Sequence, residues 1–92
     1  MDLDRIELAM QCEEALGISI PDADVESFAD LGALHDTAVA LFNATHNTHD
    51  IEPLVWEQVR AIASELFEVP IDRVTRGSRV VEGLGLLPPL SP

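Results

Sequence analysis

The side chains able to do chemistry are few and scattered along the chain. The single cysteine, Cys12, stands in an apolar stripe, so we expect a buried and unreactive thiol. The spacing of His46, His49 and Asp50 suits a metal only in a helix, and no fourth ligand is in sight, so we expect a solvated linker there. No nucleophile stands beside a base, and Gly83-Leu84-Gly85 lacks the lysine of a phosphate-binding loop. The sequence therefore predicts no catalytic residue, no metal and no enzyme.

The charge balance points to a protein partner. The chain has 92 residues, with 17 aspartates and glutamates against five basic residues, all arginine, and a net charge of -12. Such a surface repels nucleic acid and anionic membranes, and it favours a basic patch on another protein. The length suits one domain. The sequence shows no signal peptide and no apolar run of about 18 residues, so we expect a cytoplasmic protein.

Helical spacing of apolar residues predicts an all-α bundle. Residues 2–16 read as a helix that ends at Gly17, and residues 22–28 read as a short helical turn. A further helix begins after Asp30, and another covers residues 52–68. The polar segment 43–53 is the predicted linker.

The loops and the C-terminal part carry weaker signals. Both isoleucines of the loop after Gly17 are expected to point inward. Residues 71–75 resemble a turn, and residues 78–84 suggest one short helical turn. The tail, residues 86–92, is too rich in proline for a helix or a central strand.

The first helix has two apolar stripes on roughly opposite sides. One stripe contains Leu8, Cys12 and Leu16. A helix of a small bundle needs one buried face, so the second stripe is either a docking surface or a face that a loop or a second subunit covers. The second stripe and the acids around it form the predicted partner-binding set: Leu3, Asp4, Ile6, Glu7, Met10, Glu13 and Glu14.

Two blocks of this sequence resemble the acyl carrier protein family. Asp2-Leu3-Asp4-Arg5-Ile6-Glu7-Leu8, followed by Glu13-Glu14 and by Gly17-Ile18-Ser19-Ile20-Pro21-Asp22, resembles the second helix of that family and its following loop. The segment 56–85 resembles the family's first helix and the loop after it. The blocks stand in reversed order, which resembles a circular permutation. The resemblance implies one four-helix domain, residues 1–92: residues 1–42 match the second to fourth helices, 43–53 join the blocks, 54–85 match the first helix and its loop, and 86–92 form a tail.

The resemblance also bears on the prosthetic group of the family. Carrier proteins attach phosphopantetheine to a serine that corresponds to Asp2 here, and a carboxylate cannot form that phosphodiester. Ser91 is the alternative attachment site, because the C-terminus is expected to return near the first helix. The leading expectation is therefore a carrier-like module without a cofactor.

Three functions remain open at this point. The first is a non-enzymatic module that docks on acyl-chain-handling enzymes through its acidic first helix. The second is a working acyl or aminoacyl carrier modified at Ser91, and the third is a domain-swapped dimer. We expect Arg73, Arg76 and Arg79 to face solvent or to pair with the acids of the first helix, with binding to a second copy as the alternative. Trp56 is expected to anchor the edge of the core.

Overall fold

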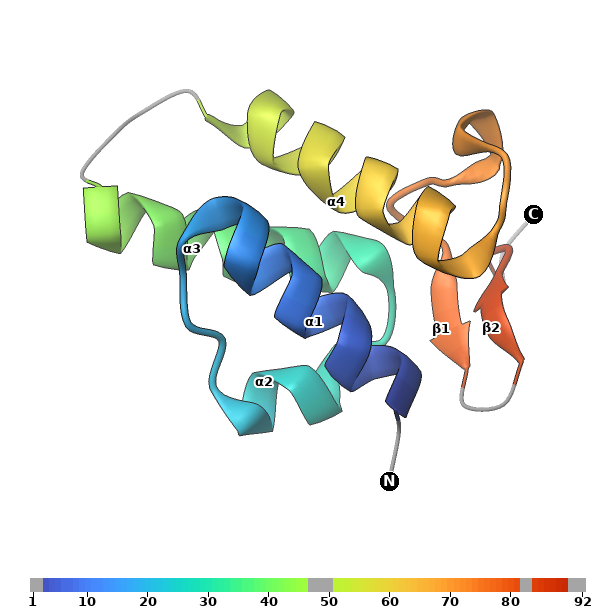
Figure 1. Ribbon diagram of the computed structural model, residues 1–92, viewed down its shortest axis with the longest axis horizontal. Coiled ribbons are helices and arrows are strands. Elements are labelled where there is room, and N and C mark those ends of the chain that lie inside the picture. The colour runs from blue at the N-terminus through green and yellow to red at the C-terminus, as the bar shows by residue number, and fades with distance from the viewer. Residues whose placement is uncertain (1–2, 47–50, 82–83, 90–92) are drawn as a thin grey trace.

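The computed structural model describes residues 3–46, 51–81 and 84–89 (Figure 1). Four α-helices precede a 3-10 turn and a small hairpin. In chain order the elements are α1 (Leu3–Leu16), α2 (Asp22–Ser27), α3 (Leu31–His46), α4 (Glu52–Phe67), η1 (Ile71–Arg73), β1 (Arg79–Val81) and β2 (Gly85–Leu87). The predicted all-α class is confirmed for the helices, whereas the hairpin was not predicted.

Local chemistry explains where the helices begin and end. Gly17 has φ +65, a conformation that glycine adopts without steric cost, and its N–H donates to the carbonyl of Glu13 at 2.8 Å. Asp30 caps α3, because its Oδ1 accepts the N–H of Ala33 at 2.9 Å. Helix α4 ends at Glu68, which has φ 55 and the left-handed conformation typical of a C-terminal cap.

The core lies where α1 and α3 pack against α4. Helix α1 buries the predicted stripe of Leu8, Cys12 and Leu16, together with Ala9. Both loop isoleucines are buried as predicted, and Trp56 is half-buried against the core. The other buried apolar residues are Ile18, Ile20, Val25, Phe28, Leu31, Leu34, Ala38, Val39, Val55, Val59, Ala63, Val74 and Val80. Helical spacing therefore identified the inward stripe of α1 correctly.

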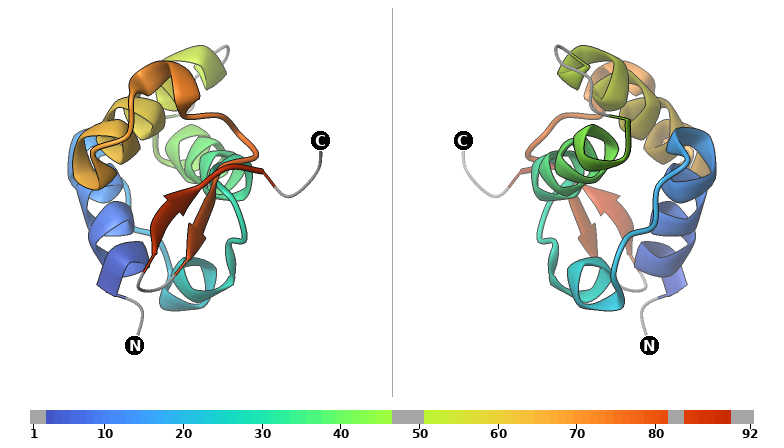
Figure 2. Two further views of the ribbon diagram at one scale, coloured as in Figure 1. Left: turned by 90° about the vertical axis from the view of Figure 1, so that its right-hand side faces the viewer. Right: turned by 90° about the vertical axis from the view of Figure 1, so that its left-hand side faces the viewer.

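The C-terminal segment closes one end of the bundle, as Figure 2 shows. Strands β1 and β2 are antiparallel, with Val80 opposite Leu86. The short segment before β1 also caps α3: the N–H of Leu31 donates to Ser78 O at 2.9 Å, and the N–H of Gly32 donates to Arg76 O at 2.7 Å. This end of α3 therefore depends on residues more than forty positions later in the chain.

Two sequence predictions need correction. The segment 78–84 was expected to form a helical turn, but Arg79–Val81 is a strand, because Asp30 and β2 supply its backbone partners. The predicted linker 43–53 is shorter than expected, because α3 continues to His46 and α4 already begins at Glu52. None of the helices in the described residues is long and apolar enough to cross a membrane.

Candidate docking groove

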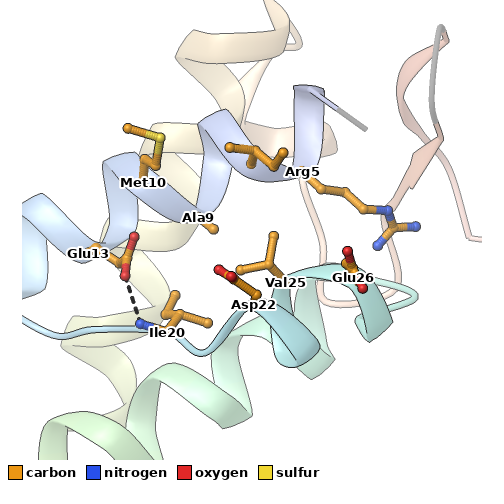
Figure 3. Close-up of a pocket in the computed structure, with 9 residues that line it drawn as sticks. Arg5, Ala9, Met10, Glu13, Ile20, Asp22, Val25 and Glu26 are labelled. Atoms are coloured by element: carbon orange, nitrogen blue, oxygen red, sulfur yellow. Dashed lines mark hydrogen bonds between the residues drawn. The ribbon is translucent and has the colours of Figure 1, made fainter. Parts of the chain in front are cut away.

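A groove of about 400 Å³ separates α1 from α2 (Figure 3). Figure 3 shows side chains from both helices and from the loop between them around this space. The groove is lined by Arg5, Ile6, Ala9, Met10, Glu13, Ile20, Asp22, Val25 and Glu26. We call it the α1–α2 groove.

The floor of the α1–α2 groove is apolar. Ala9, Ile20 and Val25 are buried, and Ile6 is half-buried against the core. The small side chain of Ala9 leaves space in front of α1, and Pro21 begins α2 directly after the buried Ile20. The second stripe of α1 is therefore divided, because Ile6 faces the floor while Met10, 58% exposed, stands at the outer edge. An apolar side chain of a ligand would lose contact with water in this space.

Carboxylates from both helices surround the apolar floor. Glu13 contributes from α1, and Asp22 and Glu26 contribute from α2. The Oε2 atom of Glu13 accepts the backbone N–H of Ile20 at 2.7 Å, which fixes the loop between the two helices. Asp22 and Glu26 are exposed, so their charges face solvent beside the groove.

Arg5 is the basic residue that lines the groove, and backbone carbonyls hold its guanidinium. The Arg5 guanidinium donates to the carbonyl of Phe28 and, at 3.0 Å, to the carbonyl of Val80. Its central carbon also lies 4.7 Å from the centre of the Phe28 ring. Arg5 therefore ties α1 to the residue after α2 and to β1. No local pattern could indicate this role, because both of the carbonyl partners lie far away in the chain.

Of the predicted docking residues, Ile6, Met10 and Glu13 line this groove, whereas Asp4, Glu7 and Glu14 lie on α1 outside its lining. Glu7, Met10 and Glu14 are exposed, whereas Asp4 and Glu13 are partly buried. The side chain of Leu3, and all of Asp2 and Ser91, lie outside the described part of the chain.

Sequence reasoning missed the α2 wall of the groove. The prediction used one helix, whereas Asp22, Val25 and Glu26 supply the opposite side. An apolar residue with acids on both sides in residues 22–26 was the available signal, but six residues are too few for a clear helical stripe. Two helices rather than one therefore enclose the groove.

A second polar cluster is formed by residues of α3 and of the segment before β1. Arg76 donates from Nη2 to Oδ1 of Asp36 at 2.9 Å, and its Nη1 lies 2.9 Å from Nδ1 of the buried His35. The His35 ring meets the Trp56 ring edge-on, with centroids 5.8 Å apart. The hydrogen bond from Arg76 is the main cause that lowers the pKa of the Asp36 carboxyl below its usual value. This cluster joins α3 to the segment before β1.

One expectation, that the arginines of the C-terminal part pair with the acids of α1, is not met in the described residues. Arg76 pairs with Asp36 of α3 rather than with the acids of α1. The Nε of Arg79 donates to the carbonyl of Pro88 at 3.0 Å, and Arg73 is exposed. Among the residues that the structure describes, none of these three arginines therefore pairs with an acid of α1.

The remaining nucleophile candidates have structural surroundings. Burial raises the pKa of the Cys12 thiol to about 12, so the thiolate is scarce at neutral pH. The Ser64 hydroxyl donates to Val69 O at 2.6 Å, and the Ser78 Oγ accepts the N–H of Thr75 at 2.9 Å. Among the residues that the structure describes, no three His, Cys, Asp or Glu side chains form a group able to hold a metal ion.

A second cleft of about 480 Å³ follows the end of α4 and the outer side of β2. It is lined by Glu68, Val69, Pro70, Arg73, Ser78, Leu86, Leu87 and Pro88. This rim carries one acidic residue, Glu68, and one basic residue, Arg73, so its charge favours neither a basic nor an acidic partner. The α1–α2 groove is the stronger candidate because its apolar floor and acidic rim occur together.

Comparisons with known proteins give no match: no protein-family model, no curated protein and no solved structure is similar to this chain.

Proposed function

We propose that this protein is a non-enzymatic docking module that binds a basic, partly apolar segment of a partner protein in the α1–α2 groove. The observation that carries the proposal is the apolar floor of Ile6, Ile20 and Val25 bordered by carboxylates of both helices. A leucine or phenylalanine of the partner would enter the groove, and lysines or arginines beside it would meet the acidic rim.

The charge distribution supports a basic partner. Helix α1 carries Asp4, Glu7, Glu13 and Glu14, and α2 carries three further acids among its six residues. Arg5, the one basic residue of these two helices, already donates to backbone carbonyls. An exposed ion pair contributes only about 0.2–1 kcal/mol, so the acids would steer and orient the partner while the apolar contact supplies most of the affinity.

We also propose that the module derives from an acyl carrier protein by circular permutation and lacks the phosphopantetheine arm. The order of the elements supports this reading, because a long, a short and a long helix precede the helix that matches the family's first. The contact of β1 with α1 supports it too, since it puts the end of the 54–85 block beside the first turns of α1. A regulator or adaptor of enzymes that handle carrier-bound acyl chains is the corresponding role.

Binding of a defined peptide tests the docking function. The probe is a fluorescent helical peptide with leucines along one face and lysines on both sides of them. We expect binding that weakens as the salt concentration rises, with amide NMR shifts confined to α1, α2 and their loop. A peptide of equal charge without the leucines should bind much less. Absence of binding, or shifts elsewhere on the protein, would contradict the proposal.

A matched pair of charge reversals tests the position of the site. Glu7 and Glu14 are exposed on α1, and Glu57 and Glu65 are exposed on α4. Changing either pair to lysine alters the net charge equally, but only the α1 pair stands on a helix that lines the groove. We expect the α1 variant to bind the peptide about tenfold more weakly and the α4 variant to change little. Equal effects would show that only the overall charge matters.

Intact mass tests the absence of the arm. After incubation with coenzyme A and a broad-specificity phosphopantetheinyl transferase, we expect no added mass, while an ordinary carrier protein gains the arm. An added arm that disappears in a Ser91→Ala variant would instead support the working carrier.

A further inference from the structure

Helix α1 contains two sulfur-bearing side chains in different surroundings. Met10 is 58% exposed at the edge of the α1–α2 groove, whereas Cys12, two residues later, is fully buried. Figure 3 shows the Met10 side chain on α1, with Ala9 next to it directed toward α2. An oxidant dissolved in water can reach the thioether of Met10 without unfolding the helix, but it cannot reach the thiol of Cys12.

The chemistry of the two sulfurs also separates them. A thiol reacts with peroxide as its thiolate, and burial raises the pKa of Cys12 to about 12. A thioether reacts through its sulfur lone pair at any ordinary pH. Hydrogen peroxide is uncharged at neutral pH, so the carboxylates around Met10 do not repel it.

We propose that Met10 is an oxidation site at which hydrogen peroxide weakens docking in the α1–α2 groove. The sulfur lone pair attacks one oxygen of the peroxide, an S–O bond forms and the O–O bond breaks. The departing hydroxide takes the proton of the transferred oxygen and leaves as water. Methionine is oxidised to the sulfoxide, and the peroxide is reduced. This inference rests on the docking function proposed above.

Oxidation changes Met10, the groove-lining residue whose side chain is both apolar and exposed. Met10 has Ile6 one turn before it and Glu14 one turn after it, so it lies between the apolar floor and the acidic surface. A sulfoxide is polar and keeps its hydration, so covering it with a partner's apolar side chain loses the gain of burying a thioether. We expect binding to weaken about tenfold.

The fold itself should tolerate the change. Because Met10 is more exposed than buried in the free protein, its sulfoxide can point into water. Thermal unfolding of the oxidised protein should therefore match that of the untreated protein. This separates a change of the docking surface from general oxidative damage to the core.

The test compares the wild-type protein with Met10→Leu, which keeps an apolar side chain of similar size and a good helix former. Both are treated with hydrogen peroxide, the position of each added oxygen is mapped by peptide mass spectrometry, and binding of the leucine–lysine peptide is measured. We expect oxygen at Met10, about tenfold weaker binding by the treated wild type, unchanged binding by treated Met10→Leu, and recovery with methionine sulfoxide reductase.

The possible failures are distinguishable. Unchanged binding by a wild-type protein that is fully oxidised at Met10 would overturn this inference and leave the docking function intact. Resistance of Met10 under conditions that oxidise a free methionine peptide would overturn it as well. If the untreated wild type does not bind the peptide, the docking function fails, and the inference fails with it.

Discussion

Replacing Arg5 with alanine should lower the free energy of unfolding, because the Arg5 guanidinium joins α1 to Phe28 and to β1. Arg5 donates to the carbonyls of Phe28 and Val80 and lies over the Phe28 ring. Hydrogen bonds from a charged donor contribute about 1.5–3 kcal/mol each, and the cation–π contact adds about 0.5–1 kcal/mol. Water would reach the two carbonyls in part, because both bonds are only partly buried. We therefore expect a loss of about 2–4 kcal/mol in the free energy of unfolding.

Urea denaturation followed by Trp56 fluorescence measures this loss. Trp56 is the only tryptophan and is half-buried against the core, so its emission reports global unfolding. With a slope of about 1.5 kcal/mol per molar urea, the midpoint should fall by about 1.3–2.7 M. Arg5→Lys should give an intermediate value, because an ammonium group keeps the charge but does not have the planar fork that reaches both carbonyls.

Arg60→Ala is the matched control. Arg60 also donates to a backbone carbonyl, that of Ile71 at 3.0 Å, but this bond is exposed. Its loss should cost about 0.5 kcal/mol, within the range of a surface interaction. If Arg5→Ala and Arg60→Ala proved equally stable, the interpretation of Arg5 as the junction of α1, α2 and β1 would be refuted.

Two further predictions concern titratable groups. Cys12 should resist alkylation in the native protein at neutral pH and react as the protein unfolds in urea, and rapid labelling without denaturant would contradict its burial. Because the pKa of Cys12 is raised in the folded state, the free energy of unfolding should decline as the pH rises above the ordinary thiol value of 9.0. The lowered pKa of Asp36 means that its bond to Arg76 contributes stability above pH 3.8, and this contribution is lost as the pH falls through the lower pKa of the folded state. Asp36→Asn should therefore be slightly less stable than the wild type near neutral pH, with the difference vanishing in acid, and a difference that persists at low pH would point to another cause.

The differences between prediction and structure are concentrated in the C-terminal third and at the helix ends. The three-residue strands have no alternating pattern long enough to read, and β1 forms because Asp30 and β2 bond to it. Helix α3 extends over residues 43–46, which favour loops, because Leu41 and Phe42 pack against the core and an existing helix propagates easily.

The candidate site was likewise predictable where it depends on local spacing, and not where it depends on residues distant in the chain. Helical spacing alone put Ile6, Met10 and Glu13 in the predicted docking set, and these three line the groove, because a side chain's position on a helix follows from its number. It could not identify Val25 as the opposite wall, since the approach of α2 depends on how the loop between the helices folds. The bond from Ile20 to Glu13 fixes that loop, and it joins residues seven positions apart.

The sequence by itself determined the helices, the inward stripe of α1 and the acidic charge. These properties depend on residue type and local spacing, so they can be read from a linear pattern. Only the tertiary structure decided that Arg5 joins α1 to Phe28 and β1, and that two helices rather than one enclose the groove. Such contacts join residues distant in the chain, and many pairings satisfy the same local pattern. Close packing of the whole core selects one of them.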